Sequence, residues 1–270
     1  MSTTRKPRVR IDQLLVERSL APSRAKAQAL VMAGAVSSGG RRVDKVGTLV
    51  DSDAELAVDG GSRFVSRGGD KLDHALEQFA QAGLEVKGAI CADLGASTGG
   101  FTDCLLSRGA AKVYAVDVGY GQLAFSLRQD ARVVVRERTN AKNLARDDFA
   151  ELIDVVVVDA SFIGLGMLMT AIGRIVRPGG ALVALVKPQF EAGKEAARRG
   201  RGVIRDPEVR ARAIESAKEA VTRAGFSIRA EVDSALAGPK GNRERFLYAI
   251  YSRPDSSVDA GASSPETSPT

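Results

Sequence analysis

Residues 89–102 read Ala-Ile-Cys-Ala-Asp-Leu-Gly-Ala-Ser-Thr-Gly-Gly-Phe-Thr, and this stretch decides the fold. Its first residues are apolar and lead to Asp93, which predicts a buried strand that ends in an acid. The glycines at 95, 99 and 100 predict a tight turn, and the residues beyond them predict the start of a helix. Glycine has no Cβ and adopts positive φ, so such a turn brings the backbone close to a small ligand.

The turn differs from the two common phosphate-binding forms. It lacks the Lys-Ser/Thr ending of a P-loop, and it is not the G-x-G-x-x-G of dinucleotide sites. The amides at the start of the following helix would face a polar group of the ligand. The acid Asp93, just before the turn, favours a ligand that carries an amine or a positive charge. S-adenosylmethionine (SAM) is therefore the predicted cofactor, and no metal is predicted.

Beyond residue 66 the chain alternates between strand and helix patterns. Wholly apolar runs such as residues 155–158 are typical of strands that are buried on both faces, which favours a parallel, doubly wound sheet. We therefore expect an α/β fold with a Rossmann-like SAM-dependent methyltransferase domain, built on a seven-stranded, mostly parallel sheet. The expected strands are 89–93, 112–117, 132–136, 154–158, 181–186, 227–232 and 245–251, and the expected helices lie near 100–108, 121–128, 165–176 and 207–224.

Polar residues follow successive strands, at the edge of the sheet where such folds bind ligands. Asp117 is placed to accept both ribose hydroxyls of an adenosine, and Asn140 is placed at the adenine edge. Taken alone, Asp117 fits an ordinary turn residue equally well, but the ordered set predicts a nucleoside pocket. The predicted cofactor-binding residues are Asp93, Gly95, Ala96, Ser97, Gly99, Gly100, Phe101, Asp117, Val118, Asn140 and Asp159.

Residues 8–60 show a different pattern, that of a small α+β unit. Ser23 predicts the N-cap of a helix over residues 24–33, and Gly34 predicts its end. The unit resembles the S4 RNA-binding domain, and the resemblance rests on the runs 10–15, 23–27, 34–36 and 39–43. It implies a basic face that contacts an RNA backbone. The alternative is that the same charges only form a solvated helix face. The residues placed to make these contacts are Arg10, Arg24, Lys26, Arg41, Arg42 and Lys45.

Lys187 ends the fifth expected strand, an unusual place for a lysine unless its ammonium group reaches solvent. The runs around it complete a resemblance, over residues 8–252, to the hemolysin A (TlyA) family. Members of that family are S4-domain ribosomal RNA 2′-O-methyltransferases with an FtsJ-like catalytic domain. The matching runs are 65–72, 93–102, 117–123, 137–140, 159–163, 186–191 and 241–242, with Glu244 after them. One departure is Phe64, where some relatives place Trp.

The resemblance implies a Lys-Asp-Lys-Glu catalytic tetrad, which falls on Lys71, Asp159, Lys187 and Glu244. A neutral Lys187 would remove the proton of a ribose 2′-hydroxyl. Lys71 would favour that neutral form by like-charge repulsion, while the two acids would hold the lysines and the substrate. The implied partners are ribosomal RNA and ribosomal subunits, with a cytidine of 23S rRNA, and in some members also of 16S rRNA, as the target.

Further RNA contacts are expected from basic residues that border the predicted site, although a solvated mobile loop would carry the same residues. They are Arg67, Lys194, Arg198, Arg199 and Arg201. The chain of 270 residues has a net charge of +6. Residues 254–270 contain three acids and no base, which leaves +9 on the rest. This basic body favours a polyanionic partner.

The sequence also indicates where the protein acts. No apolar run approaches the roughly 18–20 residues of a membrane span, and the basic, polar N-terminus does not resemble a secretory signal. Cys91 and Cys104, the only cysteines, lie in apolar segments and are expected to be buried thiols, which fits a reducing compartment. We therefore expect a cytoplasmic protein without a membrane partner.

Five segments are expected: a flexible basic N-terminus (1–7), the S4-like unit (8–60), a linker (61–66), the methyltransferase domain (67–252) and a disordered tail (253–270). A monomer is favoured. Two other functions stay open, a non-catalytic S4-type RNA-binding or ribosome assembly factor and a membrane-lytic hemolysin. Methylation of a base is the alternative within methyltransferases. It is disfavoured because Asp159 is followed by Ala-Ser-Phe and not by an Asn-Pro-Pro-Tyr-type motif.

Overall fold

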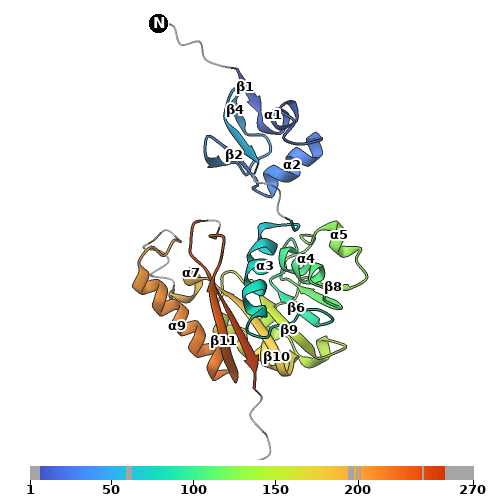
Figure 1. The fold of residues 1–270 in the computed structure, drawn as a ribbon, viewed down its shortest axis with the longest axis vertical. Coiled ribbons are helices and arrows are strands. Elements are labelled where there is room, and N and C mark those ends of the chain that lie inside the picture. The colour runs from blue at the N-terminus through green and yellow to red at the C-terminus, as the bar shows by residue number, and fades with distance from the viewer. Residues whose placement is uncertain are drawn as a thin grey trace, which may run out of the picture.

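The computed structural model of the chain describes residues 7–58, 63–193, 198, 200, 202–238 and 240–252. Within these ranges a small N-terminal unit stands beside a larger α/β unit (Figure 1). Several expected features lie outside the described residues: residues 1–6 of the N-terminal extension, residues 61–62 of the linker, the tail 253–270, and the loop residues Lys194, Arg199 and Arg201.

A seven-stranded sheet forms the centre of the larger unit. Its strands in spatial order are β11 (Phe226–Asp233), β12 (Arg245–Tyr251), β10 (Val176–Val186), β9 (Ile153–Val158), β6 (Ile90–Leu94), β7 (Lys112–Val116) and β8 (Val133–Arg136). The strands from β10 to β8 are parallel, and β12 runs antiparallel to both of its neighbours. The expected α/β class with a seven-stranded, mostly parallel sheet is confirmed.

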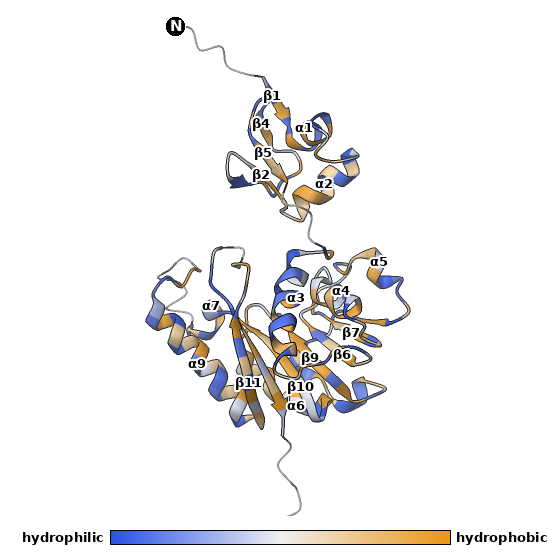
Figure 2. Cartoon of the chain, in the orientation of Figure 1, coloured by the Kyte–Doolittle hydropathy of each residue, from blue (hydrophilic) through white to orange (hydrophobic). Residues whose placement is uncertain are grey.

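Helices cover both faces of this sheet, and successive strand residues face opposite layers. Cys91 points into a core shared with α3 (Arg67–Ala80) and α4 (Gly100–Ser107). The next residue, Ala92, points into a second core shared with α6 (Met169–Ile175) and α9 (Pro207–Arg223). Both faces are therefore buried in the middle of the sheet, which is why central strands such as β9 are mostly apolar and orange in Figure 2.

Three segments differ from the expected elements. The helix expected near 121–128 is reduced to α5 (Phe125–Arg128), because residues 119–122 form a loop that folds back on the end of β7. The helix expected over 165–176 is divided into the 3-10 turn η3 (Leu165–Met167) and α6. The strand expected at 181–186 begins earlier, at Val176, with an irregular pairing to β9 before Ala181. Cys91 and Cys104 are both buried thiols, as expected.

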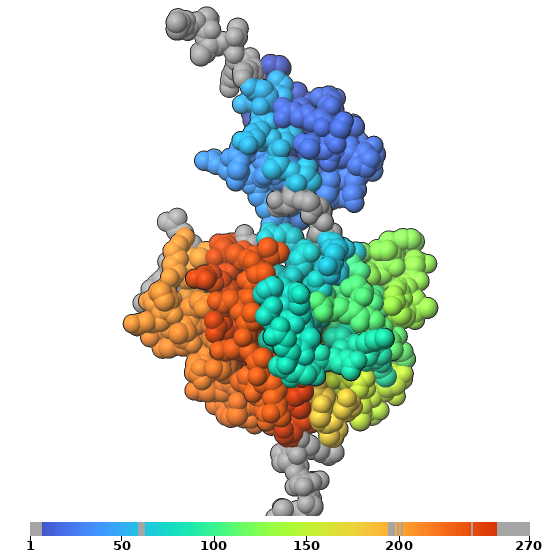
Figure 3. Space-filling model, in the orientation of Figure 1, coloured from blue at the N-terminus to red at the C-terminus, as the bar shows by residue number. Residues whose placement is uncertain are grey.

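The N-terminal unit contains α1 (Ile11–Glu17) and α2 (Arg24–Met32), together with five short strands and its own apolar core. The Ser23 side chain accepts a hydrogen bond from the Lys26 amide at 3.3 Å, and Gly34 follows the helix with φ +65°, as the sequence predicts. The strands β2 (Val36–Ser38), β3 (Arg41–Arg42) and β5 (Leu56–Val58) form one sheet. A second sheet, of β1 (Arg8–Arg10) and β4 (Leu49–Asp51), was not predicted. Figure 3 shows this unit as a separate lobe next to the larger one.

Candidate active site

The carboxyl ends of β6, β7, β9 and β10 meet at one edge of the sheet, and two adjoining cavities open there. One, of about 360 Å³, is lined by residues that follow β6, β7, β8 and β9. The other, of about 660 Å³, lies toward α3 and the N-terminal unit. Gly95, Ser97, Asp159 and Ser161 line both cavities, so a ligand in one lies next to a ligand in the other.

The smaller cavity matches the predicted nucleoside pocket in its lining. Asp117 ends β7, and its two carboxylate oxygens accept hydrogen bonds from the amides of Ser97 (2.8 Å) and Gly119 (2.6 Å). These bonds tie the loops after β6 and β7 to one carboxylate. Each oxygen keeps a further lone pair for a ligand hydroxyl. The predicted cofactor residues in its lining are Gly95, Ser97, Asp117, Val118, Asn140 and Asp159, whereas Ala96, Gly100 and Phe101 line the larger cavity.

The glycines of the turn also allow close packing, a use that the sequence did not predict. A Cβ on Gly95, which has φ +93°, would lie 2.9 Å from the carbonyl oxygen of Asp159. A Cβ on Gly100 would lie 2.8 Å from the amide nitrogen of Gly69 in α3. The missing side chains therefore let the turn pack closely against the loop after β9 and against α3. Gly99, at φ +96°, packs against Leu127 and lines neither cavity.

Asp93 is fully buried at the end of β6 and also lines neither cavity. One of its oxygens accepts a hydrogen bond from the hydroxyl of Thr102 at 2.7 Å, and the other has no hydrogen-bond partner among the described residues. Burial raises the pKa of Asp93 to about 7, against the opposing effect of the Thr102 hydrogen bond. Because Asp93 is enclosed beneath the turn, the structure does not place this predicted cofactor residue in direct contact with a ligand in either cavity.

The four residues of the expected tetrad line the larger cavity as two ion pairs. Lys71 and Glu244 are both buried, and Lys71 Nζ donates to Glu244 Oε2 at 2.6 Å. Lys187 Nζ lies 2.7 Å from Asp159 Oδ1 and donates to the hydroxyl of Ser161 at 2.8 Å. Because Glu244 neutralises Lys71, the expected repulsion between the two lysines is weaker than for two free ammonium groups.

Packing between distant segments sets these positions. Helix α3 carries Lys71 and is fastened to α4 by Asp73, whose carboxylate accepts from Arg108 Nε at 2.7 Å. Glu244 lies just before β12, and its carbonyl oxygen accepts from the Ser234 amide at 3.0 Å. Lys187 directly follows β10. The pairs thus join α3 to β12, and β9 to β10, across the same cavity.

The basic residues expected at RNA are distributed unevenly. Arg42 of β3 and Arg67 of α3 line the larger cavity, and neither pairs with a carboxylate within the described ranges. Arg10 and Arg24 instead hold the buried Asp12, each with a guanidinium Nε 3.0 Å from it. Lys26, Arg41, Lys45 and Arg198 are exposed and line neither cavity.

Sequence reasoning missed several neighbours of the site. Ser161 contacts Lys187, Thr102 contacts Asp93, and Glu191 bonds to the amide of Leu165 at 2.7 Å. All three lie within the runs that carry the family resemblance, so the sequence could have marked them as candidate site residues. It could not have shown which residues they contact, because each contact joins separate segments of the structure.

Comparison with known proteins identifies the larger unit. Residues 64–251 match the FtsJ-like methyltransferase family. The chain belongs to the FtsJ-like methyltransferase family. Residues 9–56 match the S4 domain, so this methyltransferase carries an S4 domain in front of its catalytic unit.

The relatives of this methyltransferase cover most of its length. It is 46% identical over 243 residues to the Mycobacterium tuberculosis protein named 16S/23S rRNA (cytidine-2′-O)-methyltransferase TlyA. The matched region covers 89% of this chain and 89% of the relative. It is 45% identical over 241 residues to Bacillus subtilis YqxC, named as a candidate rRNA methyltransferase, covering 88% of this chain and 84% of YqxC. A solved Streptococcus thermophilus structure, named as a hemolysin candidate, is 40% identical and covers 92% of this chain and 90% of that one, with a TM-score of 0.71.

The described residues contain neither a membrane-spanning helix nor a cluster of metal ligands. None of the helices in those ranges is long and apolar enough to cross a membrane. No group of three or more His, Cys, Asp or Glu side chains in the same ranges is placed to hold a metal ion.

Proposed function

We propose that this methyltransferase transfers a methyl group from SAM to the 2′-hydroxyl of a cytidine ribose in ribosomal RNA, in 23S rRNA and also in 16S rRNA. The observation that carries the proposal is the cavity in which Lys71, Asp159, Lys187 and Glu244 form two ion pairs. The target class comes from the names of the relatives, and the tetrad comes from the family resemblance.

The residues present suit SAM as the cofactor. Asp117 would accept the ribose hydroxyls, and Asn140 would lie beside the adenine. The neighbouring cavity, which shares Ser97 and Asp159 with this one, would hold the target nucleotide. SAM supplies a methyl group on a sulfonium centre, which needs no further activation. The protein therefore has to position the hydroxyl and take up its proton.

Lys187 is proposed to act as the general base in its neutral form. The ammonium that pairs with Asp159 first releases a proton to solvent; the neutral amine then keeps its hydrogen bonds to Asp159 and Ser161, and its lone pair takes up the proton of the 2′-hydroxyl. Lys71, held by Glu244, would donate a hydrogen bond to the 2′-oxygen as it loses its proton. Positioning of this kind supplies much of the rate of a displacement reaction.

The S4 domain and the basic residues near the cavity are proposed to hold the RNA through its phosphates. Arg42 and Arg67 line the cavity with guanidinium groups that have no carboxylate partner among the described residues. Contacts to phosphates position an RNA without reading much sequence. A cytidine within folded RNA would also have to leave its stack to reach the lysines.

Methylation of purified ribosomal subunits with labelled SAM tests the proposal, followed by mapping of 2′-O-methylated nucleotides. We expect methyl transfer by the wild type and a loss of at least a hundredfold for Lys187→Ala. Lys112→Ala is the matched control, because Lys112 pairs with Glu151 at the opposite end of β7. Retention of near wild-type activity by Lys187→Ala would falsify the assignment of the base.

The methylation assay, together with dye release from liposomes, distinguishes the two alternative functions. A non-catalytic RNA-binding protein would bind subunits and give no methylation with any variant. A membrane-lytic protein would release dye from liposomes at the concentrations at which it is tested on RNA.

A further inference from the structure

Glu191 occupies an unusual place for a carboxylate. It ends the short helix α7 (Pro188–Glu191), one turn after Lys187, and its side chain is half-buried. Burial raises the pKa of Glu191, although the amide of Leu165 opposes the effect. A partly buried carboxyl destabilises the fold unless a specific contact compensates for its lost hydration. Glu191 therefore calls for a role that an apolar residue could not fill.

Its contact joins two loops of the active site. Glu191 Oε1 accepts a hydrogen bond of 2.7 Å from the backbone amide of Leu165, the first residue of η3. On its own side Glu191 is tied to Lys187, because the amide of Glu191 donates to the Lys187 carbonyl oxygen at 3.3 Å. The carboxylate thus connects the loop that carries Lys187 with the loop over residues 159–165.

The loop over residues 159–165 needs such a connection. At its beginning the amide of Asp159 donates to the carbonyl oxygen of Leu94 at 3.0 Å, and at its end the Leu165 amide donates to Glu191. Between these anchors Phe162 adopts φ +68° and is exposed. A bulky residue in this left-handed region costs on the order of 1–3 kcal/mol and persists only where its surroundings fix it.

We propose that Glu191 is a positioning residue for methyl transfer, which holds Asp159 and Ser161 against Lys187 by fastening their loop at Leu165. The inference rests on the proposed function. Lys187 Nζ lies 2.7 Å from Asp159 Oδ1 and 2.8 Å from Ser161 Oγ, and both of these partners belong to the fastened loop. Release of Leu165 would let that loop move while the amine stays with β10.

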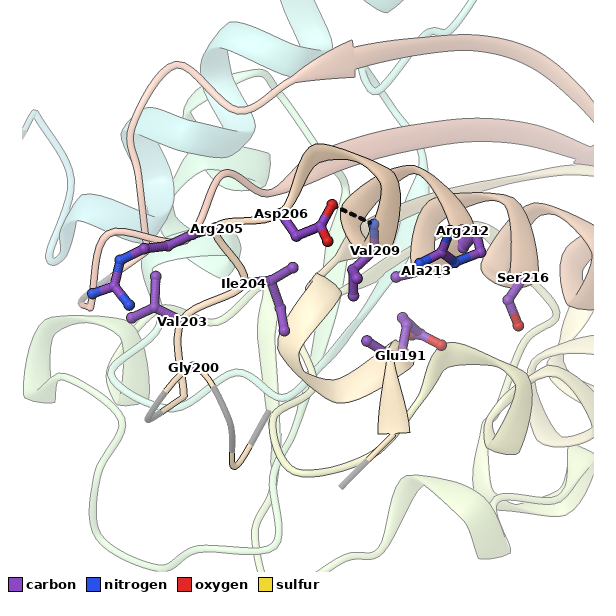
Figure 4. A pocket seen from close by; sticks show the side chains of 11 residues that line it. Glu191, Gly200, Val203, Ile204, Arg205, Asp206, Val209, Arg212, Ala213 and Ser216 are labelled. Atoms are coloured by element: carbon purple, nitrogen blue, oxygen red, sulfur yellow. Dashed lines mark hydrogen bonds between the residues drawn. The ribbon is translucent and has the colours of Figure 1, made fainter. Parts of the chain in front are cut away.

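A third cavity gives the clamp room to open. It measures about 600 Å³ and is lined by Glu191, by residues of α9 such as Val209 and Ala213, and by the segment before α9 (Figure 4). The carboxylate borders this space, whereas the Leu165 side chain packs in the core that α9 shares, so removal of the Glu191 side chain releases the amide of Leu165 but not its side chain. The Leu165 amide would then be free to bond with water instead.

The clamp is tested first without substrate, by hydrogen exchange of the segment 160–167. Glu191→Ala removes the acceptor of the Leu165 amide. We expect the protection of this segment from hydrogen exchange to fall by about tenfold, because the loop then opens locally more often. Glu191→Gln keeps an acceptor oxygen, and we expect it to retain protection. The matched control is Glu208→Ala, which removes an exposed carboxylate of α9 that pairs loosely with Arg212. Unchanged protection in Glu191→Ala overturns the inference.

Single-turnover methylation tests the consequence for chemistry. With saturating SAM and RNA we expect Glu191→Ala to lower the rate constant by about tenfold or more, because misplacement of a catalytic group by about 1 Å can cost about a hundredfold. We expect Glu191→Gln to recover most of that rate. RNA affinity should stay within about twofold of the wild type, and SAM affinity should fall by less than the rate constant does, since Glu191 itself lines neither cavity but the fastened loop lines the cofactor cavity.

A merely structural role would give a different result. It would lower the fraction of protein that binds SAM, and the rate constant per SAM-binding molecule would stay the same. Wild-type protein that methylates no rRNA would overturn the proposed function, and the exchange experiment would still decide on the clamp.

A second substitution approaches the same contact from its other side. A Cβ on Gly164 would lie 3.0 Å from Glu191 Oε2, and Gly164 has an ordinary negative φ. We expect Gly164→Ala to lower the rate constant in the wild type and to have little further effect in Glu191→Ala. Additive effects in this double-mutant cycle would contradict a shared contact.

Discussion

Lys71 and Glu244 lie 173 positions apart in the chain and form a buried ion pair of 2.6 Å. The pair connects helix α3 with the start of β12 and lines the same cavity as the Lys187–Asp159 pair. The tetrad is therefore arranged as two neutral pairs. Because the charges of the four side chains cancel, the cavity can admit the neutral hydroxyl of a ribose. The two amines and two carboxylates that line the cavity can then contact that hydroxyl.

Loss of one partner of the buried pair should destabilise the fold strongly. Lys71→Met leaves the carboxylate of Glu244 buried and without its cation, and we expect the free energy of unfolding to fall by about 3–5 kcal/mol. The double variant Lys71→Met/Glu244→Leu buries no charge, and we expect it to regain most of that stability. Urea unfolding measures both effects.

Activity should separate from stability in these variants. The double variant is expected to fold and to give no methylation, because the pair that faces the substrate is gone. As a reference, Arg212→Met breaks the exposed pair with Glu208 and should cost less than about 1 kcal/mol. A double variant that methylates RNA at the wild-type rate would exclude Lys71 and Glu244 from the chemistry.

The stability of the protein should depend on pH through Asp93. Its pKa in the folded protein is about 7, because of burial. In the unfolded chain a carboxyl titrates near pH 3.9. The folded state thus keeps a proton that the unfolded state has lost, and its stability falls as the pH rises from about 4 to about 7, by up to about 1.4 kcal/mol per pH unit.

Asp93→Asn removes this dependence and keeps an acceptor for the hydroxyl of Thr102. We expect the difference in unfolding free energy between Asp93→Asn and the wild type to shift in favour of the variant between pH 5 and pH 7.5. Asp130→Asn is the control, since the hydrogen bond from Arg132 lowers the pKa of this surface carboxyl to about 2. Parallel pH profiles for Asp93→Asn and the wild type would show that Asp93 is ionised throughout.

The sequence was sufficient for the fold class of the larger unit and for the approximate positions of its strands. Strands that are buried on both faces are apolar at every position, as residues 155–158 are, and their alternation with helices leaves few arrangements open. The sequence indicated a glycine turn after β6, but it did not show that these glycines also allow neighbouring segments to pack closely. Gly100 is small because α3 packs on it, and that packing is visible only once α3 is in place.

The pairing of the site residues could not be read from their spacing. Lys71 meets Glu244 because α3 packs on α4 while β12 returns antiparallel beside β10. The pair β1–β4 was missed for another reason, since strands of three residues are too short to show a period. In the sequence, Glu191 is only the last residue of the run 186–191, and its bond with the Leu165 amide joins two loops that no sequence pattern connects.

Arg42 is expected to contribute to methylation more than its neighbour Arg41. Both are exposed residues of β3, but only Arg42 lines the cavity that contains the tetrad. A guanidinium group there can bind a phosphate next to the target ribose through two parallel hydrogen bonds. We expect Arg42→Ala to lower kcat/KM for RNA by about tenfold, which corresponds to about 1.4 kcal/mol.

Arg41→Ala removes the same charge from the same strand and is the matched control. We expect it to change kcat/KM by less than about threefold, because an exposed basic residue contributes only general attraction to RNA. Equal losses in the two variants would mean that the S4 domain acts on RNA by charge alone and does not reach the cavity.

Asp12 is expected to orient two arginines for RNA. It is buried, and it accepts hydrogen bonds from Arg10 Nε (3.0 Å), Arg24 Nε (3.0 Å) and Gln28 Nε2 (3.0 Å). The hydrogen bond from Arg10 in particular holds the pKa of Asp12 well below its usual range. Asp12→Asn removes a negative charge close to both arginines, so charge alone predicts tighter RNA binding.

Orientation predicts the opposite, and the salt dependence separates the two causes. We expect Asp12→Asn to weaken RNA binding several-fold with an unchanged slope of log K against log salt, because the number of phosphate contacts stays the same. Arg24→Ala removes a contact and should make the slope shallower by about 0.7–0.9. Thermal unfolding of Asp12→Asn verifies that the S4 domain is folded at the assay temperature. Tighter binding by the folded variant would show that Asp12 only screens the arginines, whereas weaker binding at constant slope would show that it aligns them.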